Sequence, residues 1–278
     1  MPKRKLTSLL YDVIDIDATT LINDSADVNK QDDDGATPLH EATLNENITA
    51  MALLINSGAD VNIQNNYGEA PLICAASRNN IEAMELLINN GADVNKQDND
   101  GKTPLHKATW NASITAMTLL INNGADVNKQ DNDGKTPLHE ATWNMTLLIN
   151  SGADVNKQDN GGQTPLYAAA HHVNIKAMTL LINNGADVNK QDNYSRTPLH
   201  EATRKKNIDA IALLEKEVAN PRRQCKECKK WLPGSMIRNN QCHPCFWSHA
   251  RLLFISKREG GTFSDLPNEI LKEVTKYI

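Results

Sequence analysis

Apolar residues recur along most of this chain with the spacing of short amphipathic helices. In residues 101–124, a first helix is expected from Pro104, which suits the first helical turn, to about Asn111. A second helix is expected to end near Asn122, and its apolar residues share one face: Ile114, Met117, Leu120 and Ile121. Gly124 comes next, where a helix-ending residue with positive φ is favoured. The pattern predicts two short helices and then an extended turn.

Two short strings show that this unit is repeated. Gly-Ala-Asp-Val-Asn begins at Gly58, Gly91, Gly124, Gly152 and Gly185, with a variant at Ser25. Thr-Pro-Leu-His begins at Thr37, Thr103, Thr136 and Thr197, with degenerate copies at Ala70 and Thr164. Both strings advance in steps of 33, 33, 33, 28 and 33 residues. No unit can bury its apolar face alone, so we expect neighbouring units to stack into an all-α solenoid.

These strings closely resemble the ankyrin-repeat family over residues 6–218. The resemblance implies L-shaped repeats with short projecting hairpins and a concave face. It assigns capping helices to residues 1–24 and the repeats to residues 25–220. It also implies a structural role for the histidine of each Thr-Pro-Leu-His string, which would bond locally and hold neighbouring repeats: His40, His106, His139 and His200.

The repeat near residues 134–152 is shorter than the others. It lacks the five residues that correspond to residues 112–116 of the preceding repeat. The remaining segment, residues 145–150, is too short for a normal second helix plus loop. We therefore predict a weak point or kink at residues 140–152.

The family resemblance also implies a partner-binding face. Ankyrin repeats usually contact partners through hairpin tips and the exposed residues of the first helices, which here are Leu44, Tyr67, Arg78, Trp110, Trp143, His171, His172, Tyr194 and Arg204. Trp110 and Trp143 matter most, because they lie one repeat apart and aromatic residues are enriched in binding hot spots. The alternative is that each Trp packs sideways into its neighbour. Such repeats can also be substrates of asparaginyl hydroxylases, which marks three hairpin residues: Asn95, Asn128 and Asn189.

Charge separates the repeats from the C-terminal part of the chain. Residues 1–220 hold 18 Lys and Arg against 29 Asp and Glu, whereas residues 221–260 hold 9 against 2. The acidic repeats argue against DNA as their partner, because phosphate binding needs clustered basic residues. No stretch approaches the roughly 20 apolar residues of a membrane span, and the basic N-terminus lacks the apolar stretch of a signal peptide. We expect an intracellular protein, in the cytoplasm (host cytoplasm if the source is a virus or an intracellular bacterium), with the nucleus left open.

The basic region, residues 221–250, contains two Cys-x-x-Cys pairs. Their spacing matches a structural zinc (Zn²⁺) site with four thiolates, Cys225, Cys228, Cys242 and Cys245, with paired redox cysteines as the alternative. Such a site has no open coordination position, and too few further ligands are nearby for a second zinc, as a RING module would need. The basic residues are interleaved with Trp231, Phe246 and Trp247, a combination that can bind nucleic acid, although a simple cap on the array is the plainer interpretation. Cys74 is expected in the core.

The final segment, residues 251–278, comprises a linker and an amphipathic helix. Pro267 suits the first turn of that helix, and one apolar stripe is expected along it: Leu266, Ile270, Leu271, Val274 and Ile278. The stripe could dock on the zinc module or the last repeat. The string Leu-Pro-x-Glu-Ile-Leu-x-x-Val also resembles the opening helix of an F-box, a shortened form of the motif that binds the adaptor of cullin–RING ubiquitin ligases. Ankyrin repeats with such a motif at their C-terminal side are similar to ankyrin–F-box proteins of poxviruses and giant viruses.

The leading hypothesis is a non-enzymatic substrate receptor, in which the repeats bind a target protein and the tail recruits the ligase. The alternatives are a plain ankyrin scaffold or inhibitor, and a nucleic-acid-associated factor acting through the zinc module. We do not expect an enzyme, because we find no nucleophile–base pairing, phosphate loop or open metal site.

Overall fold

The computed structural model describes residues 27–141 and 143–219, together with the backbone of four short strands between residues 222 and 242. The expected capping helices at residues 1–24 and the tail at residues 251–278 lie outside the described residues.

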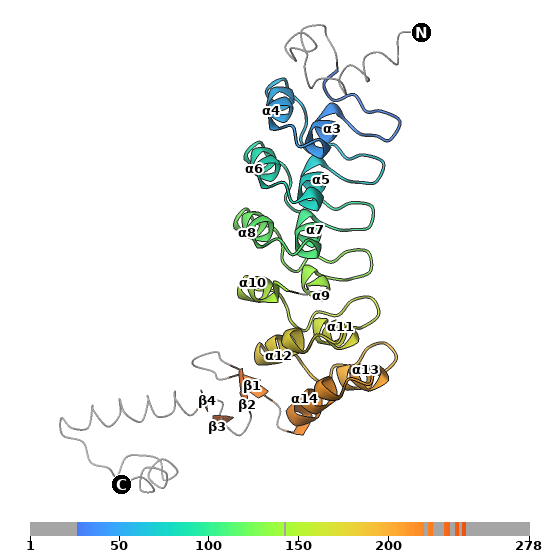
Figure 1. The fold of residues 1–278 in the computed structure, drawn as a ribbon, viewed down its shortest axis with the longest axis vertical. Coiled ribbons are helices and arrows are strands. Elements are labelled where there is room, and N and C mark those ends of the chain that lie inside the picture. Colours follow the sequence, from blue (N-terminus) through green and yellow to red (C-terminus); the bar gives the residue numbers. More distant parts are fainter. Residues whose placement is uncertain are drawn as a thin grey trace, which may run out of the picture.

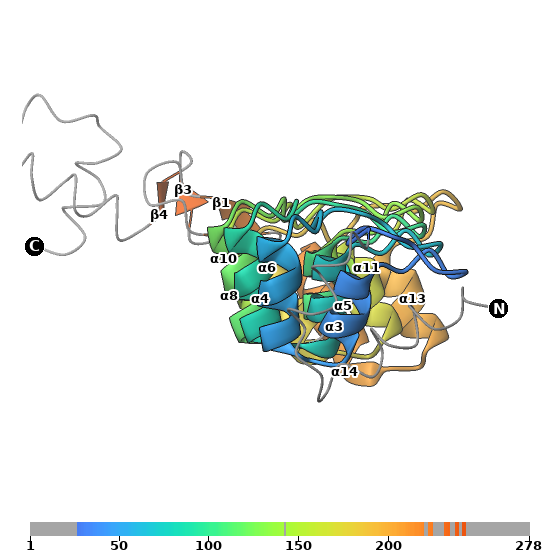
Figure 2. The same cartoon turned by 90° about the horizontal axis from the view of Figure 1, so that it is seen from above.

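The described helices form six successive pairs stacked into an elongated array (Figure 1). The first helices of the pairs are α3 (Pro38–Leu44), α5 (Pro71–Arg78), α7 (Pro104–Trp110), α9 (Pro137–Glu140), α11 (Pro165–His171) and α13 (Pro198–Arg204). The second helices are α4 (Ile48–Asn56), α6 (Ile81–Asn89), α8 (Ile114–Asn122), α10 (Met145–Asn150), α12 (Ile175–Asn183) and α14 (Ile208–Ala219). Seen from above, the hairpin loops project together along one edge (Figure 2). The predicted helical solenoid is confirmed for this part of the chain.

The Thr-Pro-Leu-His strings start the first helices and also join repeats. Thr103 Oγ accepts a bond from the backbone N–H of His106 at 3.4 Å, and His106 Nδ1 accepts one from the Thr103 N–H at 3.2 Å. Because Nδ1 is an acceptor, the ring proton lies on Nε2, which donates to the Lys135 carbonyl of the next repeat at 3.2 Å. His40 and His139 make the corresponding bonds to the next repeat at 2.9 and 3.1 Å. The predicted structural role is therefore confirmed for these three histidines.

His200 makes the bonds to its own Thr-Pro-Leu-His string. Its Nδ1 accepts the Thr197 N–H at 3.1 Å, and it lies in the last described repeat. Burial lowers the pKa of His40, His106 and His139 below its usual value, against the opposing effect of their backbone bonds. These three rings are neutral links between repeats.

Amide side chains connect the hairpin loops from repeat to repeat. Asn95 donates to the Gly124 carbonyl at 3.1 Å and accepts the Asp126 N–H at 2.7 Å. Gln97 donates to the carbonyl of Gln130, one repeat further on, at 2.9 Å. The same bonds recur along the array through other asparagines and glutamines of the strings: Asn29, Asn62, Asn128, Asn156, Gln31, Gln64, Gln130 and Gln158. Each loop is thus bonded to the next.

Glycine is required in these loops where two hairpins approach closely. A Cβ added to Gly101, which has φ +78°, would lie 2.6 Å from the backbone nitrogen of Asn132 in the next hairpin. In the last described hairpin, Ser195 takes the corresponding position with φ +61°. No described hairpin comes after Ser195, so a side chain fits there and only the backbone strain remains.

The core runs as a continuous layer between the two rows of helices. In the pairs from α3–α4 to α11–α12 it is built from one leucine of the first helix and one methionine of the second, such as Leu105 and Met117, both fully buried. In the last pair, α13–α14, Ala202, Ala210 and Leu214 are the buried apolar residues. Cys74 is 2% exposed, as expected for a core residue. The core is therefore shared between repeats, as stacking of incomplete units requires.

The shortened repeat differs from the sequence-based expectation in one respect. The missing residues shorten both helices, since α9 has 4 residues against 7 in α7, and α10 has 6 against 9 in α8. Full repeats turn between their helices through a residue with positive φ, such as Ala112. In the shortened repeat, α9 ends at Glu140 and Ala141 is extended. Residues that correspond to the last turn of α7 therefore form the connection between α9 and α10. In Figure 1 the helices α11–α14 lie at a different angle from α3–α8.

Four short strands come after the array in the chain. Strand β1 (Arg222–Gln224) pairs antiparallel with β2 (Trp231–Pro233), and β3 (Ile237–Arg238) pairs antiparallel with β4 (Gln241–Cys242). Within the part of the chain that the structure describes, no helix is both long and apolar enough to span a bilayer.

Candidate protein-binding surface

The aromatic residues expected at a binding face are exposed. Trp110 ends α7 and is 75% exposed, and Trp143, in the α9–α10 connection, is 77% exposed. Tyr67 and Tyr194, at the hairpin tips, are 64% and 77% exposed. The alternative arrangement, with each Trp packed sideways into its neighbour, is therefore not observed. Large aromatic surfaces that do not contribute to the core are available to a partner.

The other expected contact residues differ in exposure. Arg78, His171, His172 and Arg204 are exposed, whereas Leu44 is only partly exposed. Leu44 ends α3 at the position that Trp110 takes in α7. It offers less surface than the aromatic residues.

A cavity of about 700 Å³ brings four of these nine residues together. Trp110 approaches it from α7, His171 and His172 from the end of α11, and Arg204 from α13. Leu44, Tyr67, Arg78, Trp143 and Tyr194 do not line it. The cavity volume lies within the range of about 300–1,000 Å³ typical of ligand sites.

The cavity lies beside the shortened repeat. Its wall includes Glu140, the last residue of α9, and Ala141, where a full repeat continues its first helix for another turn. In α7 the corresponding turn includes Ala108 and Thr109, which are buried. Loss of that turn leaves space between α7 and α11. The five-residue deletion thus accounts for the cavity.

Glu201 anchors the side of the cavity formed by α13. Its side chain is 2% exposed, and it accepts bonds from Arg204 Nε at 2.9 Å and from His171 Nδ1 at 2.7 Å. The Tyr167 hydroxyl donates to Glu201 Oε2 at 3.3 Å. The bond from Arg204, together with that from His171, outweighs burial and lowers the pKa of Glu201 to about 2. Glu201 is therefore an anion at neutral pH, and it positions both Arg204 and His171.

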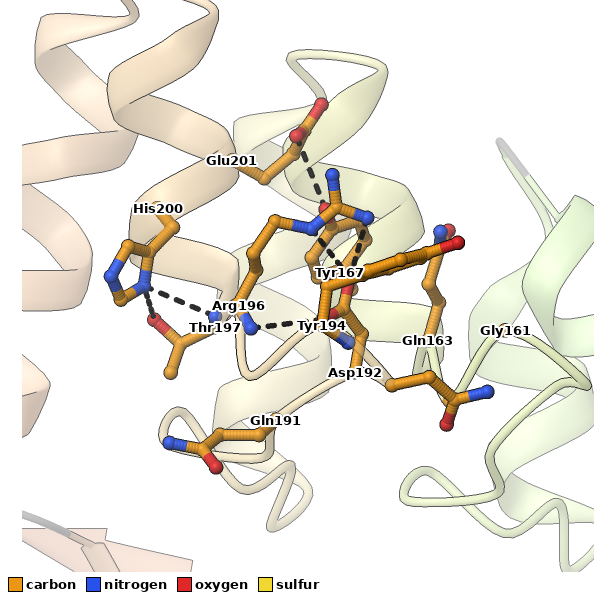
Figure 3. A network of polar contacts seen from close by, with 12 residues as sticks. Gly161, Gln163, Tyr167, Gln191, Asp192, Tyr194, Arg196, Thr197, His200 and Glu201 are labelled. Carbon is orange, nitrogen blue, oxygen red and sulfur yellow. Dashed lines mark hydrogen bonds and ion pairs between the residues drawn. The ribbon is translucent and has the colours of Figure 1, made fainter.

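Arg196 occupies a second part of the wall, from the hairpin before α13. Figure 3 shows its guanidinium group beside Asp192 and the rings of Tyr167 and Tyr194. Arg196 Nε donates to Asp192 Oδ2 at 2.8 Å, and the Asp192 side chain is fully buried. The guanidinium carbon lies 4.9 Å from the Tyr194 ring centre, within cation–π range. Tyr194 is thus linked to the cavity through Arg196.

Glu140 carries a carboxylate oxygen without a partner. Its Oε1 pairs with Lys102 Nζ at 2.8 Å, whereas its Oε2 is buried and bonds to no described residue. Such a group is costly in a folded protein. Glu140 thus presents one paired and one unpaired carboxylate oxygen among the described residues of the wall.

Several residues of the wall were missed from the sequence: Lys135, Glu140, Tyr167, Arg196 and Glu201. Tyr167 was detectable, because it replaces the histidine of the repeated string. The pairing of Glu201 with His171, 30 residues earlier, depends on how α11 and α13 stack, which the strings do not specify.

The expected hydroxylation residues differ in their bonding. Asn95 and Asn128 each bond to the next repeat through both ends of the side-chain amide. Asn189 lies in the last described repeat and is exposed. Modification at these positions stays a prediction, and Asn189 is the most accessible of the three.

The expected zinc ligands and ligase-binding helix are not described at the level of side chains. Cys242 ends strand β4, and the side chains of all four cysteines lie outside the described residues. Leu266, Pro267, Ile270, Leu271, Val274 and Ile278 also lie outside them. Among residues 27–141 and 143–219, no group of His, Cys, Asp and Glu side chains could hold a metal ion.

Comparison with known proteins identifies the repeats. A sequence model of ankyrin repeats matches three overlapping segments, residues 15–98, 90–159 and 143–225. These matches span more than half of the chain. A search of curated protein sequences found no significant match.

Proposed function

This chain belongs to the ankyrin-repeat family, whose members are generally non-enzymatic protein-interaction scaffolds, and from that premise we propose that it is a substrate receptor. The repeats bind a target protein, the zinc module connects them to the tail, and the tail recruits a cullin–RING ubiquitin ligase.

The observation that carries target binding is the exposure of Trp110, Trp143, Tyr67 and Tyr194 along an array whose other large apolar residues are mostly buried. Trp, Tyr and Arg dominate binding hot spots, because they combine a large apolar area with a polar group. A partner that covers these rings would remove them from water.

The backbone around the cysteines is compatible with a structural zinc. Cys225 and Cys228 stand in the sequence between the paired strands β1 and β2, and Cys242 ends strand β4. Two antiparallel strand pairs therefore adjoin the two Cys-x-x-Cys pairs. Four thiolates at this spacing form a closed tetrahedral site, which stabilises a module with little core.

Metal analysis tests the zinc site directly. We expect about one zinc per chain in the intact protein. Cys225→Ser/Cys228→Ser should lose it, whereas Cys74→Ser, a change to a cysteine of the array, should retain it. Zinc that is equally abundant in both variants, or absent from the intact chain, would refute the site.

The ligase link rests on the resemblance of residues 263–278 to an F-box helix. We would pull down the intact chain from eukaryotic cell extract beside Leu266→Ala/Ile270→Ala/Leu271→Ala and identify bound proteins by mass spectrometry. Lys272→Ala/Thr275→Ala/Lys276→Ala, outside the apolar stripe, is the matched control. Cullin-ligase subunits should bind the intact chain and the control but not the first variant.

Two other outcomes define the alternatives. If all three forms bind the same partners and no ligase subunit, the chain is a scaffold or inhibitor. The basic residues 221–260 favour a third function, nucleic-acid binding. Salt-sensitive binding of RNA or DNA by the intact chain, lost in Lys229→Glu/Lys230→Glu, would support that function.

A further inference from the structure

We propose that the cavity beside the shortened repeat is a peptide pocket that binds an acidic side chain of the target protein, with a neighbouring apolar side chain placed against Trp110. This inference rests on the proposed function, since it names the chemistry that the repeats recognise.

The charges around the cavity are unequally accessible. The side chains of Glu140 and Glu201 are only 10% and 2% exposed, and each has an ion-pair partner. The third carboxylate of the wall, Asp159, is partly buried, and its Oδ1 accepts the backbone N–H groups of Gly161 and Gln163 at 2.9 and 2.8 Å. The basic side chains are open, with Lys135 and Arg196 each 42% exposed and Arg204 56% exposed. An approaching ligand therefore meets positive charge, although the repeats as a whole are acidic.

The two arginines are held ready for a carboxylate. Arg204 bonds to Glu201 through Nε and Nη2, and Arg196 bonds to Asp192 through Nε and Nη2. Among the described residues, neither Nη1 has a partner. Because each guanidinium is fixed by a buried carboxylate, little side-chain entropy is lost when Nη1 donates to a ligand.

An apolar contact adjoins these donors. Trp110 is 75% exposed on the α7 side of the cavity, and Met145 of α10 contributes to the same wall. A cavity of about 700 Å³ is larger than one carboxylate needs. The geometry thus points to a short extended segment with an acidic and an apolar side chain close together.

The deletion supplies the decisive variant. Inserting Ala-Ser-Ile-Thr-Ala, the sequence of residues 112–116, between Asn144 and Met145 restores a full repeat. We expect this insertion to complete α9, close the cavity and keep the array folded. Loss of binding in a variant with an unchanged or raised melting temperature cannot be attributed to unfolding.

The probe is a library of random 12-residue peptides displayed on phage. We would select it against the full chain and, in parallel, against the insertion variant. Peptides enriched only by the full chain should share an acidic residue near an apolar one. Labelled synthetic copies should bind about tenfold or more weakly to the insertion variant and to Trp110→Ala. Ile208→Ala, which shortens an apolar side chain that is 79% exposed and lies outside the cavity wall, should change the Kd by less than about twofold.

Several results would overturn the pocket. The selection could enrich no peptide or enrich basic peptides. The selected peptides could also bind the insertion variant as tightly as the full chain, or bind the full chain with an affinity that does not fall as the salt concentration rises. The proposed function is judged separately by the pull-down of ligase subunits. A target recovered equally well with the full chain and the insertion variant refutes the pocket and leaves the receptor hypothesis standing.

Discussion

The hairpin edge and the helical edge of this array respond differently to the same five-residue deletion. On the hairpin edge, Asn128 donates to the Gly152 carbonyl at 3.0 Å, as Asn95 does to that of Gly124 at 3.1 Å, although the sequence separation falls from 29 to 24 residues. On the helical edge, both helices of the shortened repeat lose residues, and a cavity opens.

The difference shows where the stacking register is held. Hairpin bonds have fixed partners in the next repeat, so the same contact must recur in every unit. Helices meet through apolar packing, which is not directional and can lose a turn while the neighbours stay aligned. A deletion confined to the helical edge can thus create a binding surface without breaking the array.

The largest effect should come from a side chain placed between two hairpins. Gly101→Ala requires both positive φ and a Cβ 2.6 Å from the Asn132 nitrogen. We expect a loss of about 2–4 kcal/mol in the free energy of unfolding. Gly124→Ala is the matched control, because its φ is +88° but no atom lies within 4 Å of the added Cβ. Gly124→Ala should lower the free energy of unfolding, measured by urea denaturation, by only about 1 kcal/mol. If the two variants lose the same stability, the close contact between neighbouring hairpins at Gly101 does not contribute.

The next effect concerns the helical edge. Restoring the five missing residues should add a buried helical turn and stabilise the array by about 1–3 kcal/mol. Hydrogen exchange should show weak protection over residues 140–152 of the natural chain and stronger protection after the insertion. Uniform protection through the shortened repeat and its neighbours in the natural chain would contradict the predicted weak point.

A smaller effect should come from one hairpin bond. Asn128→Ala removes a donor to Gly152 and an acceptor for the Asp154 N–H. The loss should be about 1 kcal/mol, since these bonds are partly exposed to water. Asn189→Ala, in the last described repeat, should be nearly neutral. Similar losses for both changes would mean that the inter-repeat bonds contribute no net stability.

The smallest effect is a pH dependence of the links on the first helices. The pKa values of His40, His106 and His139 are lowered by burial, so the unfolded chain binds protons more readily than the folded one. Their contribution to stability is present above the unfolded pKa of about 6.5 and is lost as the pH falls through the folded pKa values. The urea concentration at the midpoint of unfolding should fall as the pH is lowered from about 7.5 to about 5. The fall should be smaller for His106→Gln than for the natural chain. An unchanged decline in that variant would exclude His106 as a source.

Several features of the site were predictable from the sequence. The resemblance to ankyrin repeats implied that Trp110 and Trp143 would be exposed and that His106 would join neighbouring repeats, and both are observed. The division of the deletion between α9 and α10 was not predictable. Comparing the two repeats shows which residues are missing. Which helix becomes shorter depends on how the remaining residues connect two helices that are already packed against their neighbours.

The sequence by itself determined the period, the helix starts, the glycine positions and the family, because these depend on local turn chemistry repeated along the chain. Only the tertiary structure decided that Trp110, Glu140, His171 and Arg204 share one cavity and that Glu201 fixes Arg204 and His171. Those contacts join different repeats, and they depend on how packing redistributes the space left by five missing residues.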